Sequence, residues 1–74
     1  MTEPVCKIHP NGDKKWWLNG KLHRTDGPAV EWANGDKEWW LNGQLYSFED
    51  YLVKLEKLGY EDQATNLLFK LDEV

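Results

Sequence analysis

The chain has 74 residues, a net charge of −4 and 41% hydrophobic residues, which suits one small globular domain. The acidic charge argues against direct binding to nucleic acid, and no stretch has the apolar length of a membrane span or the pattern of a signal peptide. Cys6 is the only cysteine and has no partner for a disulfide, so we expect a cytoplasmic protein. Ten aromatic residues supply the large rings that a thin core needs.

A stretch of ten residues occurs twice in the chain. Asn11–Gly20 reads NGDKKWWLNG and Asn34–Gly43 reads NGDKEWWLNG, an offset of 23 positions with one exchange, Lys15 for Glu38. A repeat of this length is one supersecondary unit, which buries its apolar face by packing against its copy. The sequence therefore predicts a tandem repeat.

Each copy contains a β-hairpin signal, because Asn-Gly directly follows Trp-Trp-Leu and favours a type I′ turn. Between the hairpins, Thr25–Pro28 predicts a four-residue loop that returns the chain as Ala29–Trp32. We expect an antiparallel meander of about six short strands over residues 5–46. Two-residue turns place these residues opposite each other: Leu18 and Lys21, Trp17 and Leu22, Trp16 and His23, Leu41 and Gln44, Trp40 and Leu45, Trp39 and Tyr46.

After Tyr46 the apolar period changes from two towards three or four, which predicts helices. Ser47 with Asp50 three residues later resembles a capping box, and Gly59 suits the end of this first helix. Its predicted apolar stripe is Phe48, Tyr51, Leu52, Leu55 and Leu58. A second helix is predicted from about Glu61 to Asp72, with Ala64, Leu67, Leu68 and Leu71 on its inner side and Phe69 near the edge.

The predicted fold class is α+β: two hairpin repeats of about 23 residues form an antiparallel meander, and two short C-terminal helices pack on one sheet face. We expect a single domain over residues 1–74, with the β-repeat sheet at 5–46 and the helical pair at 47–74.

Adjacent tryptophans in a strand must point to opposite faces of the sheet. If the loops have even length, the face beneath the helices holds Trp16, Leu18, His23, Val30, Trp32, Trp39, Leu41 and Tyr46. The opposite face then holds Lys15, Trp17, Leu22, Ala29, Glu31, Ala33, Glu38, Trp40 and Leu45. A three-residue turn at Asn34 would exchange the faces of the second copy.

The second of these faces has an apolar centre and charged edges, a pattern typical of contact surfaces. Trp17 and Trp40 are the candidates for its centre. The candidate partner-binding residues are Trp17, Trp40, Leu22, Leu45, Lys15, Glu31 and Glu38. Two structural alternatives stay open: each tryptophan packs over the neighbouring hairpin, or the sheet curls so that both faces are internal.

No set of residues predicts catalysis, a metal or a cofactor. Cys6 and His9 would face opposite sides of a strand, which leaves no closed set of zinc ligands. Asp26, beside His23, is interpreted as an acceptor of backbone hydrogen bonds in its own turn, with Arg24 pairing across the loop. No serine or cysteine follows a nucleophile motif, and the glycines stand singly in turns. We therefore expect a protein that is not an enzyme.

Residues 17–29, WLNGKLHRTDGPA, resemble a β-hairpin repeat of phages, giant viruses and some bacteria, which is loosely similar to MORN-type repeats. The shared features are a tryptophan, an Asn-Gly turn, a Leu-His-Arg triplet and an Asp-Gly-Pro-Ala corner. The match spans residues 11–46, and the second copy departs from it at residues 46–48, as a terminal repeat does. The resemblance implies a β-repeat binding scaffold and no activity.

The resulting functional hypothesis is a small phage-encoded protein that docks on a host protein in the host cytosol, such as a defence enzyme or nuclease, and inhibits or modulates it. The first alternative is a small-ligand binder in which aromatic side chains stack on a nucleotide or a sugar. The second is a structural protein that self-associates, with the spare sheet face forming a homodimer.

Overall fold

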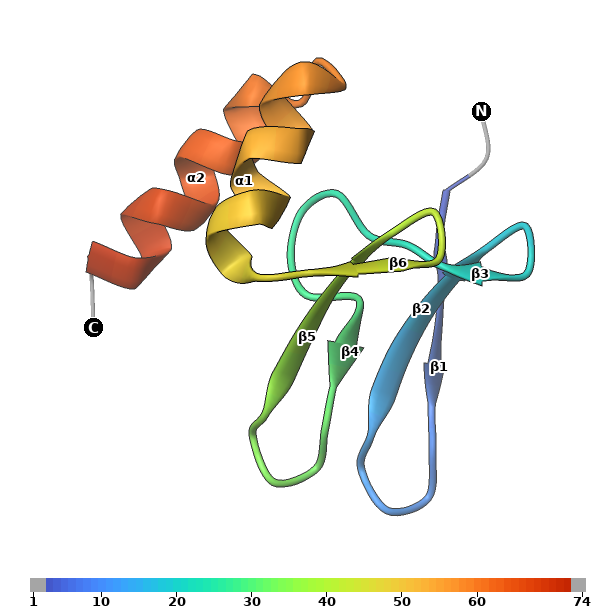
Figure 1. Ribbon diagram of the computed structural model, residues 1–74. Coiled ribbons are helices and arrows are strands. Elements are labelled where there is room, and N and C mark those ends of the chain that lie inside the picture. The colour runs from blue at the N-terminus through green and yellow to red at the C-terminus, as the bar shows by residue number, and fades with distance from the viewer. Residues whose placement is uncertain (1–2, 73–74) are drawn as a thin grey trace.

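The computed structural model describes residues 3–72, with side chains through Phe69, and contains a six-stranded antiparallel sheet followed by two helices (Figure 1). The predicted α+β class and the order of the elements are confirmed. The strands are β1 (Val5–Ile8), β2 (Lys14–Leu18), β3 (Lys21–Leu22), β4 (Val30–Glu31), β5 (Lys37–Leu41) and β6 (Gln44–Tyr46). The helices are α1 (Phe48–Lys57) and α2 (Glu61–Asp72).

Both Asn-Gly turns take the conformation that a type I′ turn requires. Asn19 and Gly20 have φ angles of 52° and 76°, and Asn42 and Gly43 have φ angles of 51° and 80°. The registers follow from the turns: Trp17 and Leu18 lie opposite Leu22 and Lys21, and the second hairpin pairs Trp39, Trp40 and Leu41 with Tyr46, Leu45 and Gln44. The predicted hairpins are therefore confirmed.

The loop between the two copies returns the chain to the edge of β2 that it has just left. The Trp16 carbonyl accepts the His23 N–H at 3.0 Å, and the Trp16 N–H donates to the Ala29 carbonyl at 2.8 Å. Consequently β3 and β4 both pair antiparallel with β2, and residues 24–28 bulge out between them. Because β4 also pairs with β5, it joins the two copies into one sheet.

This bulge corrects the predicted faces of residues 29–32. Cα partners in an antiparallel pair share a face, and Val30 lies opposite Lys15 while Glu31 lies opposite Lys14. The predicted faces require that the loop at Thr25–Pro28 reverse the chain direction. Instead β3 and β4 run in the same direction along β2, so the side chains of residues 29–32 continue the alternation of β3. Four assignments were therefore wrong: Val30 and Trp32 belong with Trp17, and Ala29 and Glu31 belong with Trp16.

Helix α1 begins and ends at the predicted signals. The Ser47 hydroxyl accepts the Asp50 N–H at 3.2 Å, which caps the first turn. At the other end, Gly59 has a φ of 95°, and the N–H groups of Gly59 and Tyr60 donate to the carbonyls of Glu56 and Leu55 at 3.1 and 2.8 Å. These two bonds form a Schellman motif, which sets the turn into α2.

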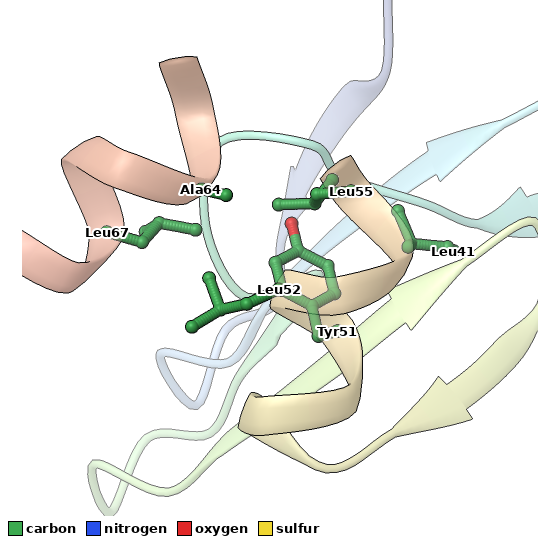
Figure 2. Close-up of a cluster of buried hydrophobic side chains, with 6 residues drawn as sticks. All are labelled: Leu41, Tyr51, Leu52, Leu55, Ala64 and Leu67. Carbon is green, nitrogen blue, oxygen red and sulfur yellow. The ribbon is translucent and has the colours of Figure 1, made fainter. Parts of the chain in front are cut away.

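The hydrophobic core lies between the helices and the second copy of the repeat, as Figure 2 shows. Trp39 on β5 packs its ring against Phe48 and Tyr51, with centroid distances of 4.7 and 5.0 Å. The face of Trp39 is therefore the one that the helices cover, as predicted. The buried members of the core are Leu41, Tyr51, Leu52, Leu55, Ala64 and Leu67.

Three residues of the predicted helix stripes need comment. Leu58 is 44% exposed and Leu68 is 47% exposed, so neither lies in the core, contrary to prediction. Leu58 follows the last residue of α1, where the chain turns away towards α2. The side chain of Leu71 lies outside the described residues.

Tyr51 fastens helix α1 to the loop of the first copy. Its ring is fully buried, and its hydroxyl donates to the carbonyl oxygens of Arg24 and Gly27, the latter at 2.9 Å. Burial of the hydroxyl raises the pKa of Tyr51, so the group stays a donor. One side chain thus links the helices to the inter-repeat loop.

The guanidinium of Arg24 stabilises the same loop through hydrogen bonds. Its Nε donates to Asp26 at 2.9 Å and its NH1 donates to Glu31 at 3.0 Å and to the Pro28 carbonyl at 3.1 Å. The guanidinium carbon lies 3.8 Å from the centre of the Trp16 ring. Arg24 therefore pairs across the loop as predicted, whereas Asp26 accepts a hydrogen bond from this guanidinium.

Candidate functional site

The sheet face that the helices do not cover is the candidate site. One cross-strand row of this face runs from Val5 through Trp17 to Leu22, and Trp40 and Leu45 form a corresponding pair in the second copy. A second row runs from Lys7 through Lys15 and Val30 to Glu38. We call this surface the uncovered face: Val5, Lys7, Lys15, Trp17, Leu22, Val30, Trp32, Glu38, Trp40 and Leu45. Val30 lies beneath the others, since it is only 1% exposed.

Glu38 organises the half of the uncovered face that belongs to the second copy. Its Oε1 accepts the indole N–H of Trp40 at 2.9 Å, and its Oε2 accepts the indole N–H of Trp32 at 3.1 Å. In the first copy the equivalent residue is Lys15, whose Nζ lies 5.2 Å from the centre of the Trp32 ring. The single exchange between the two copies therefore places a carboxylate and a cation around the same ring.

The structure brings six of the seven candidate residues together. Lys15, Trp17, Leu22, Glu38 and Trp40 are half-buried on the uncovered face, and Leu45 is 57% exposed there. Glu31 was a wrong candidate, since it lies on the opposite face and bonds Arg24. The two tryptophans are thus neither sealed in the core nor fully exposed.

Four residues of the uncovered face were not predicted from the sequence. Val30 and Trp32 were predicted on the helix-covered face, because the phase of the alternation after the loop was predicted wrongly. Val5 and Lys7 belong to β1, for which no register had been derived; Val5 lies opposite Trp17 and is 60% exposed. The alternation of β1 together with the turn at Asn11 was the signal that could have placed them.

His23 is buried and acts as a structural residue. Its Nδ1 accepts the backbone N–H of Asn42 at 3.0 Å, so the ring carries its proton on Nε2. Burial lowers the pKa of His23 below its ordinary value of 6.5. This bond ties the first copy to the turn of the second.

The free energy of unfolding is therefore expected to fall as the pH is lowered from 6.5 towards the lower pKa of His23 in the folded chain. In this window the unfolded chain binds a proton at His23 that the folded chain excludes, so acid favours unfolding. Urea titrations at several pH values measure the effect. His23→Asn keeps an acceptor near the position of Nδ1 and does not titrate, so its free energy of unfolding should change less with pH. If the free energies of parent and variant change equally with pH, the exclusion of a proton from His23 does not cause the loss of stability in acid.

The two Asn-Gly-Asp turns are also joined to each other. Asp13 Oδ1 accepts the backbone N–H of Ala33 at 2.7 Å, and this bond, followed by that from Asn11, lowers the pKa of Asp13. Beside the turns lies a hollow of about 420 Å³, lined by Asn11, Asp13, Trp32, Ala33, Asn34 and Asp36. Within residues 3–72, no group of three His, Cys, Asp or Glu side chains is placed to hold a metal ion.

Comparison of the chain with known protein families, curated proteins and solved structures gives no match. In the part of the chain that the structure describes, neither helix has the length and apolar character needed to cross a membrane.

Proposed function

We propose that this chain is a small non-enzymatic binding protein that docks on another protein through the uncovered face. The observation that carries the proposal is a pair of apolar contacts, one in each copy. Val5, which is 60% exposed, lies opposite Trp17, and Leu45, which is 57% exposed, lies opposite Trp40; both tryptophan rings are half-buried. Tryptophans framed by exposed aliphatic side chains are typical anchors of protein interfaces.

The kind of partner rests on the resemblance of residues 11–46 to repeats of phages, giant viruses and some bacteria. In this proposal the partner is a host protein in the cytosol, such as a defence enzyme or a nuclease, and docking inhibits or redirects it. The net charge of −4 supports a protein partner over a nucleic acid.

Exchange of the central rings tests the proposal. Trp17→Ala and Trp40→Ala are each expected to weaken capture of the host partner about thirtyfold or more, because interface tryptophans typically contribute about 2 kcal/mol or more. Affinity capture from the natural host, followed by mass spectrometry and measurement of the dissociation constant, provides the readout.

Two exposed residues separate loss of binding from loss of folding. Leu45→Asp alters the uncovered face at a site that is 57% exposed, and Leu68→Asp makes the same change on α2, where the side chain is 47% exposed. Thermal unfolding of both variants should resemble that of the parent. If Leu45→Asp and the tryptophan variants fold and capture the same proteins as Leu68→Asp, the uncovered face is not the docking surface.

A further inference from the structure

The outer edge of β1 presents backbone groups that are ready to pair. The Trp16 N–H donates to the Ala29 carbonyl, and the Trp16 carbonyl accepts the His23 N–H. Both hydrogen bonds lie on the side of β2 that faces away from β1. Its partner in β1, Cys6, therefore makes a pair without hydrogen bonds, and the N–H and carbonyl of Cys6 point outward.

The other residues of β1 alternate with Cys6. Val5 and Lys7 bond inward to β2, and the inward ladder continues with the His9 N–H, which donates to the Asp13 carbonyl at 2.8 Å. Ile8, like Cys6, then directs its N–H and carbonyl outward. Within residues 3–72, no strand pairs with this outer edge. Open edges of this kind accept an added strand.

The positive charge of Lys7 on this edge favours an added strand that carries an acidic residue. Lys7 lies directly opposite Lys15, and like charges in opposite positions destabilise a sheet. Both salt bridges among the described residues belong to Arg24, so neither lysine has a carboxylate within 4.0 Å there. A carboxylate placed opposite Lys7 on a new strand would supply the missing counter-charge.

The apolar side chains of β1 define the rest of the pattern. Val5 is 60% exposed on the uncovered face, and Ile8 is 68% exposed on the other face. An added strand with aliphatic residues opposite both positions would bury them. A second copy of β1 fits less well, because residues 5–8 include no acidic residue to place opposite Lys7.

We propose that the outer edge of β1 binds an extended segment of a partner protein, which adds a strand to the sheet and places a carboxylate opposite Lys7 and aliphatic side chains opposite Val5 and Ile8. This contact uses backbone groups of Cys6 and Ile8 for affinity and the side chains for selectivity. It shares the side chains of Val5 and Lys7 with the uncovered face but adds the backbone edge of β1, so it goes beyond docking through that face and is tested through the backbone groups of Cys6 and Ile8.

Two end-blocked peptides that differ in one charge provide the test: Ser-Val-Glu-Thr-Val-Ser and Ser-Val-Lys-Thr-Val-Ser. Each is titrated into the isotope-labelled protein, and amide chemical shifts are followed by NMR. The glutamate peptide is expected to shift the amide signals of Cys6 and Ile8 more than those of Val5 and Lys7. Its affinity should exceed that of the lysine peptide by about fivefold or more, as expected for exchanging one favourable cross-strand charge pair for a repulsive one.

A matched pair of variants checks that the backbone is responsible. Cys6→Pro removes the outward N–H and leaves the inward bonds of Val5 and Lys7 in place, whereas Cys6→Ser keeps the N–H. We expect Cys6→Ser to bind the glutamate peptide like the parent and Cys6→Pro to lose at least about tenfold in affinity, roughly the contribution of one hydrogen bond that cannot form.

Three results would overturn the proposal: no shifts at Cys6 and Ile8, equal affinity for both peptides, or shifts at these residues that depend on protein concentration alone, which would assign the edge to a second copy. The parent protein with the two peptides decides the matter even if Cys6→Pro does not fold. The indole N–H signals of Trp17 and Trp40 report on binding at the uncovered face, and the amide signals of Cys6 and Ile8 report on binding at the edge of β1. Failure of one proposal can therefore be distinguished from failure of the other.

Discussion

Tyr51→Ala is expected to lower the free energy of unfolding by about 3–5 kcal/mol, and Tyr51→Phe by about 1–3 kcal/mol. The ring is fully buried against Trp39, and its hydroxyl is the donor to the carbonyl oxygens of Arg24 and Gly27. Phenylalanine keeps the packing and removes only the donor. Urea denaturation followed by tryptophan fluorescence measures both changes.

Tyr60→Phe is the control for this pair. Tyr60 is 37% exposed, so removal of its hydroxyl should change the free energy of unfolding by less than about 0.5 kcal/mol. If Tyr51→Phe costs no more than Tyr60→Phe, the hydroxyl does not fasten the helices to the loop.

Leu55→Ala is expected to lower the free energy of unfolding by about 2–5 kcal/mol. Leu55 is fully buried in the cluster that joins β5, α1 and α2 (Figure 2). Domains are typically stable by about 0.05–0.15 kcal/mol per residue, so such a loss in a 74-residue chain leaves a large unfolded fraction. Far-ultraviolet circular dichroism and thermal unfolding give the readout.

Leu68→Ala provides the matched comparison for Leu55→Ala. The side chain of Leu68 is 47% exposed, and its truncation should change the free energy of unfolding only slightly. Equal losses for the two variants would show that the cluster in Figure 2 is not the centre of the core.

Features determined by neighbouring residues could be predicted from the sequence. Asn19-Gly20 and Asn42-Gly43 each determine a turn, and each turn determines the register of its hairpin. The ends of α1 follow in the same way from Ser47 and Gly59. From these local signals the opposite orientation of adjacent tryptophans also follows, which located Trp17 and Trp40 on the uncovered face.

The path of residues 24–28 could not be predicted in this way. Its shape depends on distant partners, above all the Tyr51 hydroxyl, 24 and 27 positions away in sequence from the carbonyls it binds. The sequence of the loop is compatible with a hairpin turn, so the phase of the alternation was taken wrongly. That one error misplaced Glu31 in the candidate site and omitted Trp32 from it.

The contact between Tyr51 and the inter-repeat loop has a consequence for how such a chain can grow. The hydroxyl donates to main-chain carbonyl oxygens. A loop with the same backbone shape presents these oxygens whatever its side chains are. A further unit of 23 residues inserted ahead of Ser47 would offer the same two acceptors to the same tyrosine. We therefore expect the same helical pair to close a sheet that has been lengthened by whole units of 23 residues.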